Sequence, residues 1–127
     1  MLIPWIKEGL DPNVNYAEVR NPACRGPPWE RDHFIELQYV QYANSINNMF
    51  WISSDLNGYK SRINLGQYIG DVRIHTYLCS DFTTNQTPVW QVVQGFLNSL
   101  IHNANPPVSA IGMRLSNDIG LGNLWCL

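Results

Sequence analysis

The chain has 127 residues, the length of one ordinary domain built around a single hydrophobic core. Only 14% of its residues are charged and its formal net charge is −2, which argues against the clustered positive charge of a nucleic-acid-binding protein. No apolar run reaches the roughly 18 residues of a membrane span, and the first residues do not resemble a secretory signal. We therefore expect the chain in a cytoplasm or in a particle assembled there, with no membrane partner.

The first third of the chain predicts little regular structure. The segment "LIPWIKEGL" predicts a short N-terminal helix that ends at the turn signal Asp11-Pro12. Several residues that break helices and strands follow, namely Pro22, Gly26, Pro27 and Pro28. We therefore predict a short extended segment at residues 15–19 and then a loop that ends near Asp32.

The middle of the chain predicts strands. Residues 34–42 fit a strand or a helix by periodicity, but β-branched and aromatic residues favour a strand there and again at residues 48–53. Asn57-Gly58 is typical of a hairpin turn. Residues 59–67 and 70–80 are the next predicted strands. In the second of these, alternation assigns one face to Val72, Ile74, Thr76 and Leu78.

The clearest element is an amphipathic helix at about residues 88–102, with Thr87 as its predicted N-cap and Pro88 at the first helical position. Its apolar side consists of Val89, Val92, Val93, Phe96, Leu97, Leu100 and Ile101. Alternation then predicts a last strand at residues 108–116, followed by a glycine-rich turn. The predicted fold is α+β, a single domain at residues 1–127. It is a mostly antiparallel sheet with a short N-terminal helix and one main helix packed on it.

Motifs that would support catalysis are incomplete. The stretch from Asp55 to Gly58 is similar to part of a calcium loop but lacks the closing glutamate, and "GLGNLW" lacks the third glycine of a dinucleotide fingerprint. Glu30, Asp32 and His33 could serve acid–base chemistry, but charges clustered at a loop end are usually solvated. We therefore predict no catalytic, cofactor-binding or metal site, and no enzyme.

The cysteines and the remaining histidines also suggest structural roles. Cys24, Cys79 and Cys126 are far apart and have no spacing typical of a metal site, which predicts three reduced, mostly buried thiols without a bridge. His75 and His102 are expected to be ordinary hydrogen-bonded histidines on their elements.

The order of segments resembles a known family. "PWIKEGL", "NVNYAEVRNPACRGPPW" leading into "HFIELQYV", then "GDVRIHTYLCSDF", an amphipathic helix and a final strand are similar to the tail-terminator or neck-terminator proteins of tailed bacteriophages. The resemblance implies a virion structural protein, assembled in the host cytoplasm, that forms a homo-oligomeric and usually hexameric ring at the head-proximal end of the tail. It implies partners among tail-tube and head-completion proteins, and at most non-specific contact with DNA passing through the lumen.

Two alternatives remain. "VVQGFLNSLIHNANPPVSAI" resembles the C-terminal helices of small RNA-phage coat proteins, and "FWISSDLNGYKS" is similar to one of their strands. The other alternative is a small hydrolase that uses His33 with Asp32.

Overall fold

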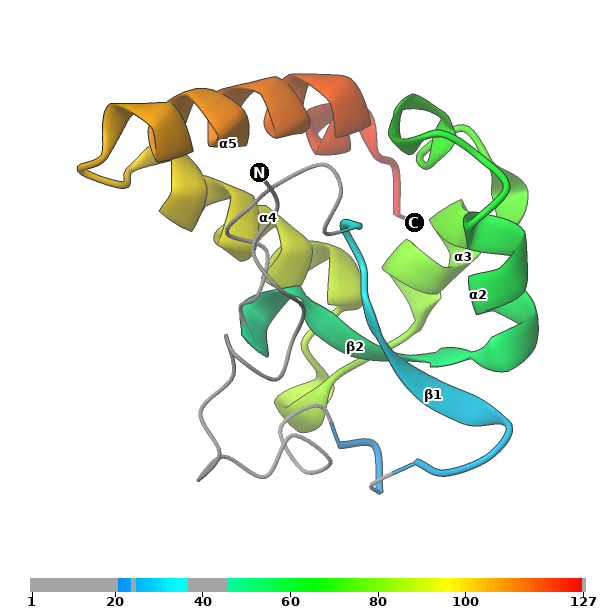
Figure 1. The fold of residues 1–127 in the computed structure, drawn as a ribbon. Helices are drawn as coiled ribbons and strands as arrows, with labels where there is room; N and C mark the ends of the chain where they lie inside the picture. The colour runs from blue at the N-terminus through cyan, green and yellow to red at the C-terminus, as the bar shows by residue number, and fades with distance from the viewer. Residues whose placement is uncertain (1–20, 24, 37–45, 127) are drawn as a thin grey trace.

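The computed structural model describes residues 21–23, 25–36 and 46–126. These residues form a two-stranded antiparallel sheet and several helices, which confirms the predicted α+β class (Figure 1). In chain order the elements are β1 (Trp29–His33), η2 (Ile46–Asn48), β2 (Met49–Ser53), α2 (Ser54–Lys60), η3 (Leu65–Gln67), α3 (Val72–Ser80), η4 (Thr84–Gln86), α4 (Val89–Ile101), α5 (Pro106–Ile119) and η5 (Leu121–Asn123). The predicted N-terminal helix and the extended segment at residues 15–19 lie outside the described residues.

The sheet pairs β1 with β2 in an antiparallel register that places Arg31 opposite Trp51. The strand predicted at residues 48–53 is confirmed as β2, and four successive residues of β2 are buried, so both of its faces are covered. The strand predicted at residues 34–42 is wrong for residues 34–36, because β1 ends at His33 and these three residues are not in a strand. Residues 37–42 lie outside the described residues. The sequence of β1, WERDH, lacks the apolar alternation that indicates a strand. Its central residues Glu30 and Arg31 are exposed.

The predicted hairpin turn at Asn57-Gly58 is wrong, and so is the predicted strand at residues 59–67. Asn57-Gly58 lies inside α2, which begins where the Ser53 side-chain oxygen accepts the backbone N–H of Leu56 at 3.1 Å. Residues 59–67 contain the end of α2, a turn and η3. The Ser53 cap therefore overrides the turn preference of the Asn-Gly pair.

Residues 72–80 form α3, so the strand predicted at residues 70–80 is wrong. The Asp71 carboxylate caps this helix by accepting the backbone N–H groups of Arg73 at 2.9 Å and Ile74 at 3.1 Å. The buried residues of α3 follow helical spacing: Ile74, Tyr77 and Leu78. Val72 and Thr76, which strand alternation placed on the same face as Ile74, are exposed.

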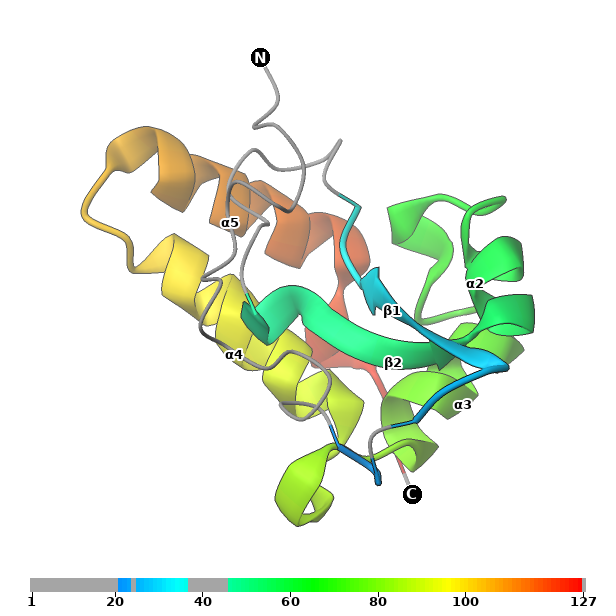
Figure 2. The same ribbon diagram turned by 60° about the horizontal axis from the view of Figure 1, so that its bottom comes forward.

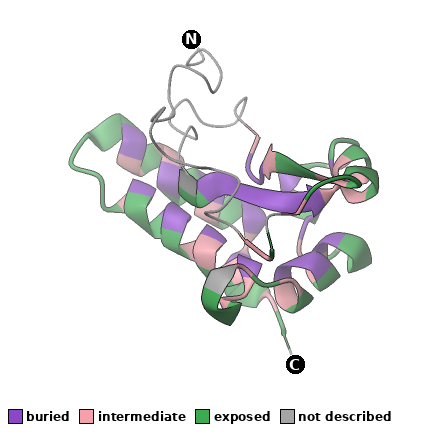
Figure 3. Cartoon of the chain, turned by 90° about the horizontal axis from the view of Figure 1, so that it is seen from below, coloured by how far each residue is buried: buried purple, intermediate pink, exposed green. Residues whose placement is uncertain are grey.

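The amphipathic helix predicted at residues 88–102 is confirmed as α4, although its N-cap is Pro88 and not Thr87. Its buried residues are Val89, Val93, Phe96, Leu97 and Leu100. They share one core with Phe50 and Ile52 of β2, and Figure 3 shows buried residues along β2 and along one side of α4. Burial of an apolar side chain of this size stabilises the fold by about 1.5–3 kcal/mol.

The strand predicted at residues 108–116 is wrong, because this segment belongs to α5. Two prolines stand in its first turn, and Gly120 ends it in the left-handed conformation with φ 64°. The buried positions of α5 are Val108, Gly112, Leu115 and Ile119. Helices α4 and α5 lie side by side in both ribbon views (Figure 2). Gly112 of α5 faces Leu100 and Ile101 of α4.

A disulfide joins Cys79 of α3 to Cys126 near the C-terminus, across 47 residues of sequence. The prediction of three reduced cysteines is therefore wrong for these two, and Cys24 lies outside the described residues. The two cysteines are far apart in the sequence, so the sequence did not indicate that they pair. They meet because the chain returns from α5 to α3.

Candidate functional site

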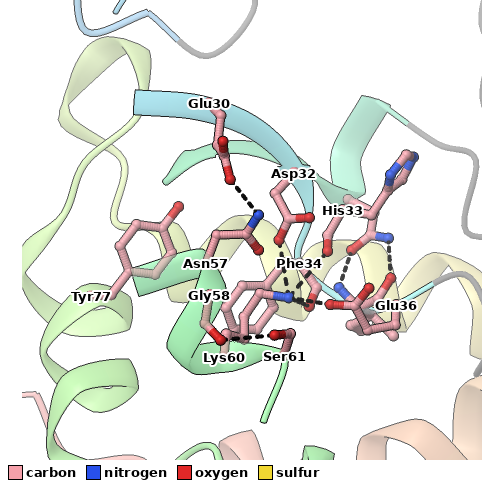
Figure 4. A network of polar contacts seen from close by, with 12 residues as sticks. Glu30, Asp32, His33, Phe34, Glu36, Asn57, Gly58, Lys60, Ser61 and Tyr77 are labelled. Carbon is pink, nitrogen blue, oxygen red and sulfur yellow. Dashed lines mark hydrogen bonds and ion pairs between the residues drawn. The ribbon is translucent and has the colours of Figure 1, made fainter. Parts of the chain in front are cut away.

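Lys60, the last residue of α2, lies at the centre of a buried polar cluster. Its side chain has 0% relative exposure, which is rare for a lysine. The ammonium group lies 3.0 Å from Asp32 Oδ2 and 2.6 Å from Glu36 Oε1 (Figure 4). It also donates to the main-chain oxygens of Phe34 at 3.1 Å and His33 at 3.4 Å. Lys60, Asp32 and Glu36 are called the Lys60 cluster below.

Aromatic rings complete the surroundings of this lysine. The Nζ atom lies 5.6 Å from the ring centroid of Phe34 and 5.8 Å from that of Tyr68. Both rings are almost fully buried and meet edge to face with their centroids 5.3 Å apart. The charged groups of the cluster therefore meet in an environment of low polarity.

The electrostatics of the cluster reflect burial and an excess of negative charge. Burial raises the pKa of Asp32, and the nearby Lys60 ammonium offsets only part of this effect. Burial would lower the pKa of Lys60, but the charge of Asp32, with Tyr68 and Glu36, brings the net pKa above its usual value. Two carboxylates share one ammonium, so the cluster has an excess of negative charge when all three groups are ionised.

The predicted solvation of Glu30, Asp32 and His33 holds only for Glu30. Glu30 is exposed and accepts a hydrogen bond of 2.6 Å from the Asn57 side chain, whereas Asp32 pairs with Lys60 and His33 is 3% exposed. Asp32 and His33 are neighbours on β1, so their side chains leave opposite faces of the strand. Figure 4 shows the His33 ring directed away from the Asp32 carboxylate. The structure therefore does not bring these two together as a hydrolase dyad.

The calcium-loop-like segment and the two remaining histidines show no arrangement typical of a catalytic or metal site within the described residues. The segment Asp55 to Gly58 is helical, and no group of three potential metal-binding side chains occurs within the described residues. His75, on α3, is hydrogen-bonded as expected, with Nδ1 3.2 Å from the Ile69 oxygen and Nε2 2.7 Å from the Trp125 oxygen. His102 follows α4 as its C-cap residue and is exposed.

An open groove of about 420 Å³ lies between α2 and α3. Its lining consists of Ser53, Leu56, Val72, Arg73, Thr76, Tyr77, Ser80 and Asp81. Val72 is 79% exposed at this groove, and Arg73 beside it pairs with Asp55 at 3.0 Å. Single exposed apolar side chains are common on protein surfaces, and a partner that docks in this groove would cover this one.

The residue that sequence reasoning missed is Lys60. It stands alone in "NGYKSR", where no charge pattern or periodicity indicates burial. Its partner Asp32 lies at the end of a predicted solvated loop, and its partner Glu36 lies in a predicted strand. Only the packing of α2 against β1 brings them together.

No family model matches the chain, and no curated protein and no solved structure is significantly similar to it. None of the helices within the described residues is long and apolar enough to cross a bilayer. Any function assigned to the chain therefore rests on its own residues and their geometry.

Proposed function

We propose that the protein is a structural and assembly protein of a virion, and specifically a tail-terminator or neck protein of a tailed bacteriophage. In this role it forms a homo-oligomeric ring at the head-proximal end of the tail. It contacts tail-tube and head-completion proteins, and DNA passes through its lumen without specific recognition. The observation that carries the assembly role is the exposed Val72 at the α2–α3 groove.

Exposed apolar side chains on separate elements support a head-to-tail contact. Met113 on α5 is 56% exposed, and Trp125 near the C-terminus is 72% exposed. A contact between different patches of identical subunits closes into a ring or continues as a filament. Val72 on α3 and Met113 on α5 lie on different elements, so a contact that joins different patches is available to this chain.

The internal pairing of charged groups also favours a structural role. Four ion pairs within the described residues, Lys60 with Asp32 and with Glu36, Arg25 with Asp81 at 3.2 Å and Arg73 with Asp55, join segments of the chain to one another. Arg73 and Asp81 line the α2–α3 groove, and both already have a partner of opposite charge within the chain.

The narrower assignment rests on the order of segments, and two of those segments differ from the family pattern. Residues 70–80 and the final predicted strand are helices α3 and α5 in this chain. The coat-protein alternative has one observation in its favour, because its matching segment forms the consecutive helices α4 and α5. Both candidates are assembly proteins.

Light scattering coupled to size exclusion tests the proposal. The expected molar mass is that of a closed ring, a small multiple of the 14.5 kDa chain. Val72→Asp is expected to lower this mass, whereas Asn98→Asp, on the exposed side of α4, is a matched control that leaves it unchanged. A chain that stays monomeric at every concentration would contradict the ring, and shells built from dimers would favour the coat-protein alternative.

A further inference from the structure

The geometry of the Lys60 cluster suits a covalent reaction between its own members. The amine nitrogen of Lys60 lies within 3.0 Å of a carboxylate oxygen of Asp32 and of a carboxylate oxygen of Glu36. We propose that Lys60 Nζ and the Asp32 side chain condense into an intramolecular amide, an isopeptide bond, with Glu36 as the group that transfers the protons. This bond joins β1 covalently to the end of α2.

The reaction balances without any further reactant. The neutral amine of Lys60 attacks Cγ of the protonated Asp32 carboxyl, and a C–N bond forms. Glu36 Oε1, 2.6 Å from Nζ, accepts a proton from the nitrogen and returns one to the departing hydroxyl. One C–O bond of Asp32 breaks and one water leaves. An ammonium and a carboxylate thus become an amide and water, with no net gain or loss of protons.

The fold lowers one barrier to this condensation by holding the amine and the acid together. Asp32 is held on a paired strand and Lys60 at the end of a helix, so the two groups meet at a high effective concentration. The fully buried Nζ limits the access of water that would favour the reverse reaction. Burial raises the pKa of Asp32, which favours the protonated acid, whereas the raised pKa of Lys60 opposes the neutral amine. The attack therefore starts with transfer of a proton from the Lys60 ammonium to the Asp32 carboxylate beside it.

Burial also favours the product over the ion pair. A buried ammonium and carboxylate each carry a desolvation cost that their attraction offsets only in part. The amide is neutral and removes both charges. It retains one N–H, for which the Phe34 oxygen, 3.1 Å from Nζ, is the nearest main-chain acceptor. The neighbouring rings of Phe34 and Tyr68 are compatible with a neutral group at this position.

The intact mass of the folded protein, measured after reduction of its disulfide, decides the proposal. We expect a mass lower than that of the sequence by one water molecule. Cleavage at methionine with cyanogen bromide then locates the bond, because Met49 lies between the two reacting residues. Under reducing conditions, fragments 2–49 and 50–113 are expected to stay joined. A folded wild-type chain that keeps the full sequence mass after prolonged incubation, and whose fragments separate, would overturn the proposal.

Variants distinguish the roles within the cluster. Lys60→Arg retains the positive charge but cannot form this amide, so its mass is expected to equal that of its sequence. Glu36→Gln retains both reacting groups and is expected to lose the bond or to form it many-fold more slowly. Glu30→Gln is the matched control, because Glu30 lies on β1 with Asp32 but pairs with Asn57, and it is expected to form the bond as the wild type does. Equal extents of bond formation in the Glu36 and Glu30 variants would exclude Glu36 as the proton-transfer group.

Discussion

The side-chain amide of Asn48 pairs with the backbone of Ile35 through two hydrogen bonds, in the manner of a neighbouring strand. Asn48 Nδ2 donates to the Ile35 oxygen and Asn48 Oδ1 accepts from the Ile35 N–H, both at 2.9 Å. Both residues have 0% exposure. This contact supplies hydrogen-bond partners to the backbone N–H and oxygen of Ile35, beyond the end of β1. It also holds the segment that carries Glu36 close to Lys60.

Replacement of Asn48 by Ala should be strongly destabilising. It leaves the buried N–H and oxygen of Ile35 without these partners, at a cost of about 1–3 kcal/mol for each group. Asn57→Ala is the control, because Asn57 makes only an exposed hydrogen bond to Glu30. Denaturant unfolding of both variants measures the difference, and similar losses in the two would contradict this role for Asn48.

Gly112 allows α5 to approach α4 closely. A Cβ atom at this position would lie 2.7 Å from Leu100 Cβ and 2.7 Å from the Ile101 nitrogen. Gly112→Ala should therefore lower the free energy of unfolding by about 1–3 kcal/mol. Gly95→Ala, in α4, meets nothing within 4 Å and should raise it by about 0.5–1 kcal/mol, because alanine favours the helix. Thermal unfolding of the two variants should shift in opposite directions, and a tolerated Gly112→Ala would refute the close approach.

Asp71 should make the stability of α3 depend on pH. Burial raises the pKa of Asp71, but hydrogen bonds from Tyr59 and from the backbone N–H groups of Ile74 and Arg73 together lower it below its usual value. Because the folded pKa is the lower one, the carboxylate stabilises the fold above the unfolded pKa of about 3.9, and this contribution disappears as the pH falls through the folded value.

Asp71→Asn tests this dependence, since asparagine keeps a capping oxygen but not the charge. We expect a loss of about 0.3–1 kcal/mol at neutral pH that vanishes at acidic pH below the folded pKa. Asp118→Asn, at an exposed position of α5, is a control that should not reproduce the loss. Melting temperatures from neutral to strongly acidic pH give the comparison. A difference that stays constant over this range would exclude the charge as its cause.

The disulfide between Cys79 and Cys126 should contribute substantially to stability in an oxidising solution. Closing a loop of 47 residues corresponds to as much as about 4 kcal/mol in the chain-entropy account. The denatured protein should protect both thiols from alkylation until a reductant is added, and reduction should lower the melting temperature. Alkylation of both residues without reductant would contradict the bridge.

The parts of the fold that could be predicted are those where periodicity has one interpretation. Helix α4 has a complete apolar stripe and β2 has a continuous apolar run, so both were assigned from the sequence. In α3, apolar residues recur at spacings of both two and four, so strand alternation and helical spacing fit its sequence equally well. The Asp71 N-cap decides in favour of the helix. In α5 one buried position is Gly112, which contributes no apolar signal, and this leaves alternation as the stronger pattern.

The Lys60 cluster could not be predicted, because its chemistry depends on tertiary contacts. Asp32 lies in a polar strand and Lys60 in a segment that predicts a turn and a strand, so neither shows its burial in the sequence. The pairing also requires α2 to pack on β1, and the Asn-Gly pair predicts a hairpin at that place. Local patterns identified Asp32 as a candidate residue, but not Lys60 or Glu36 and not their shared environment.

The most direct measurement for the assembly role is negative-stain imaging of the purified protein with averaging of particle classes. The account predicts closed rings of one diameter, with rotational symmetry close to six and a central lumen. Val72→Asp should deplete these rings while Asn98→Asp retains them. Fields that contain only single subunits, or spherical shells without a lumen, would contradict the proposed ring.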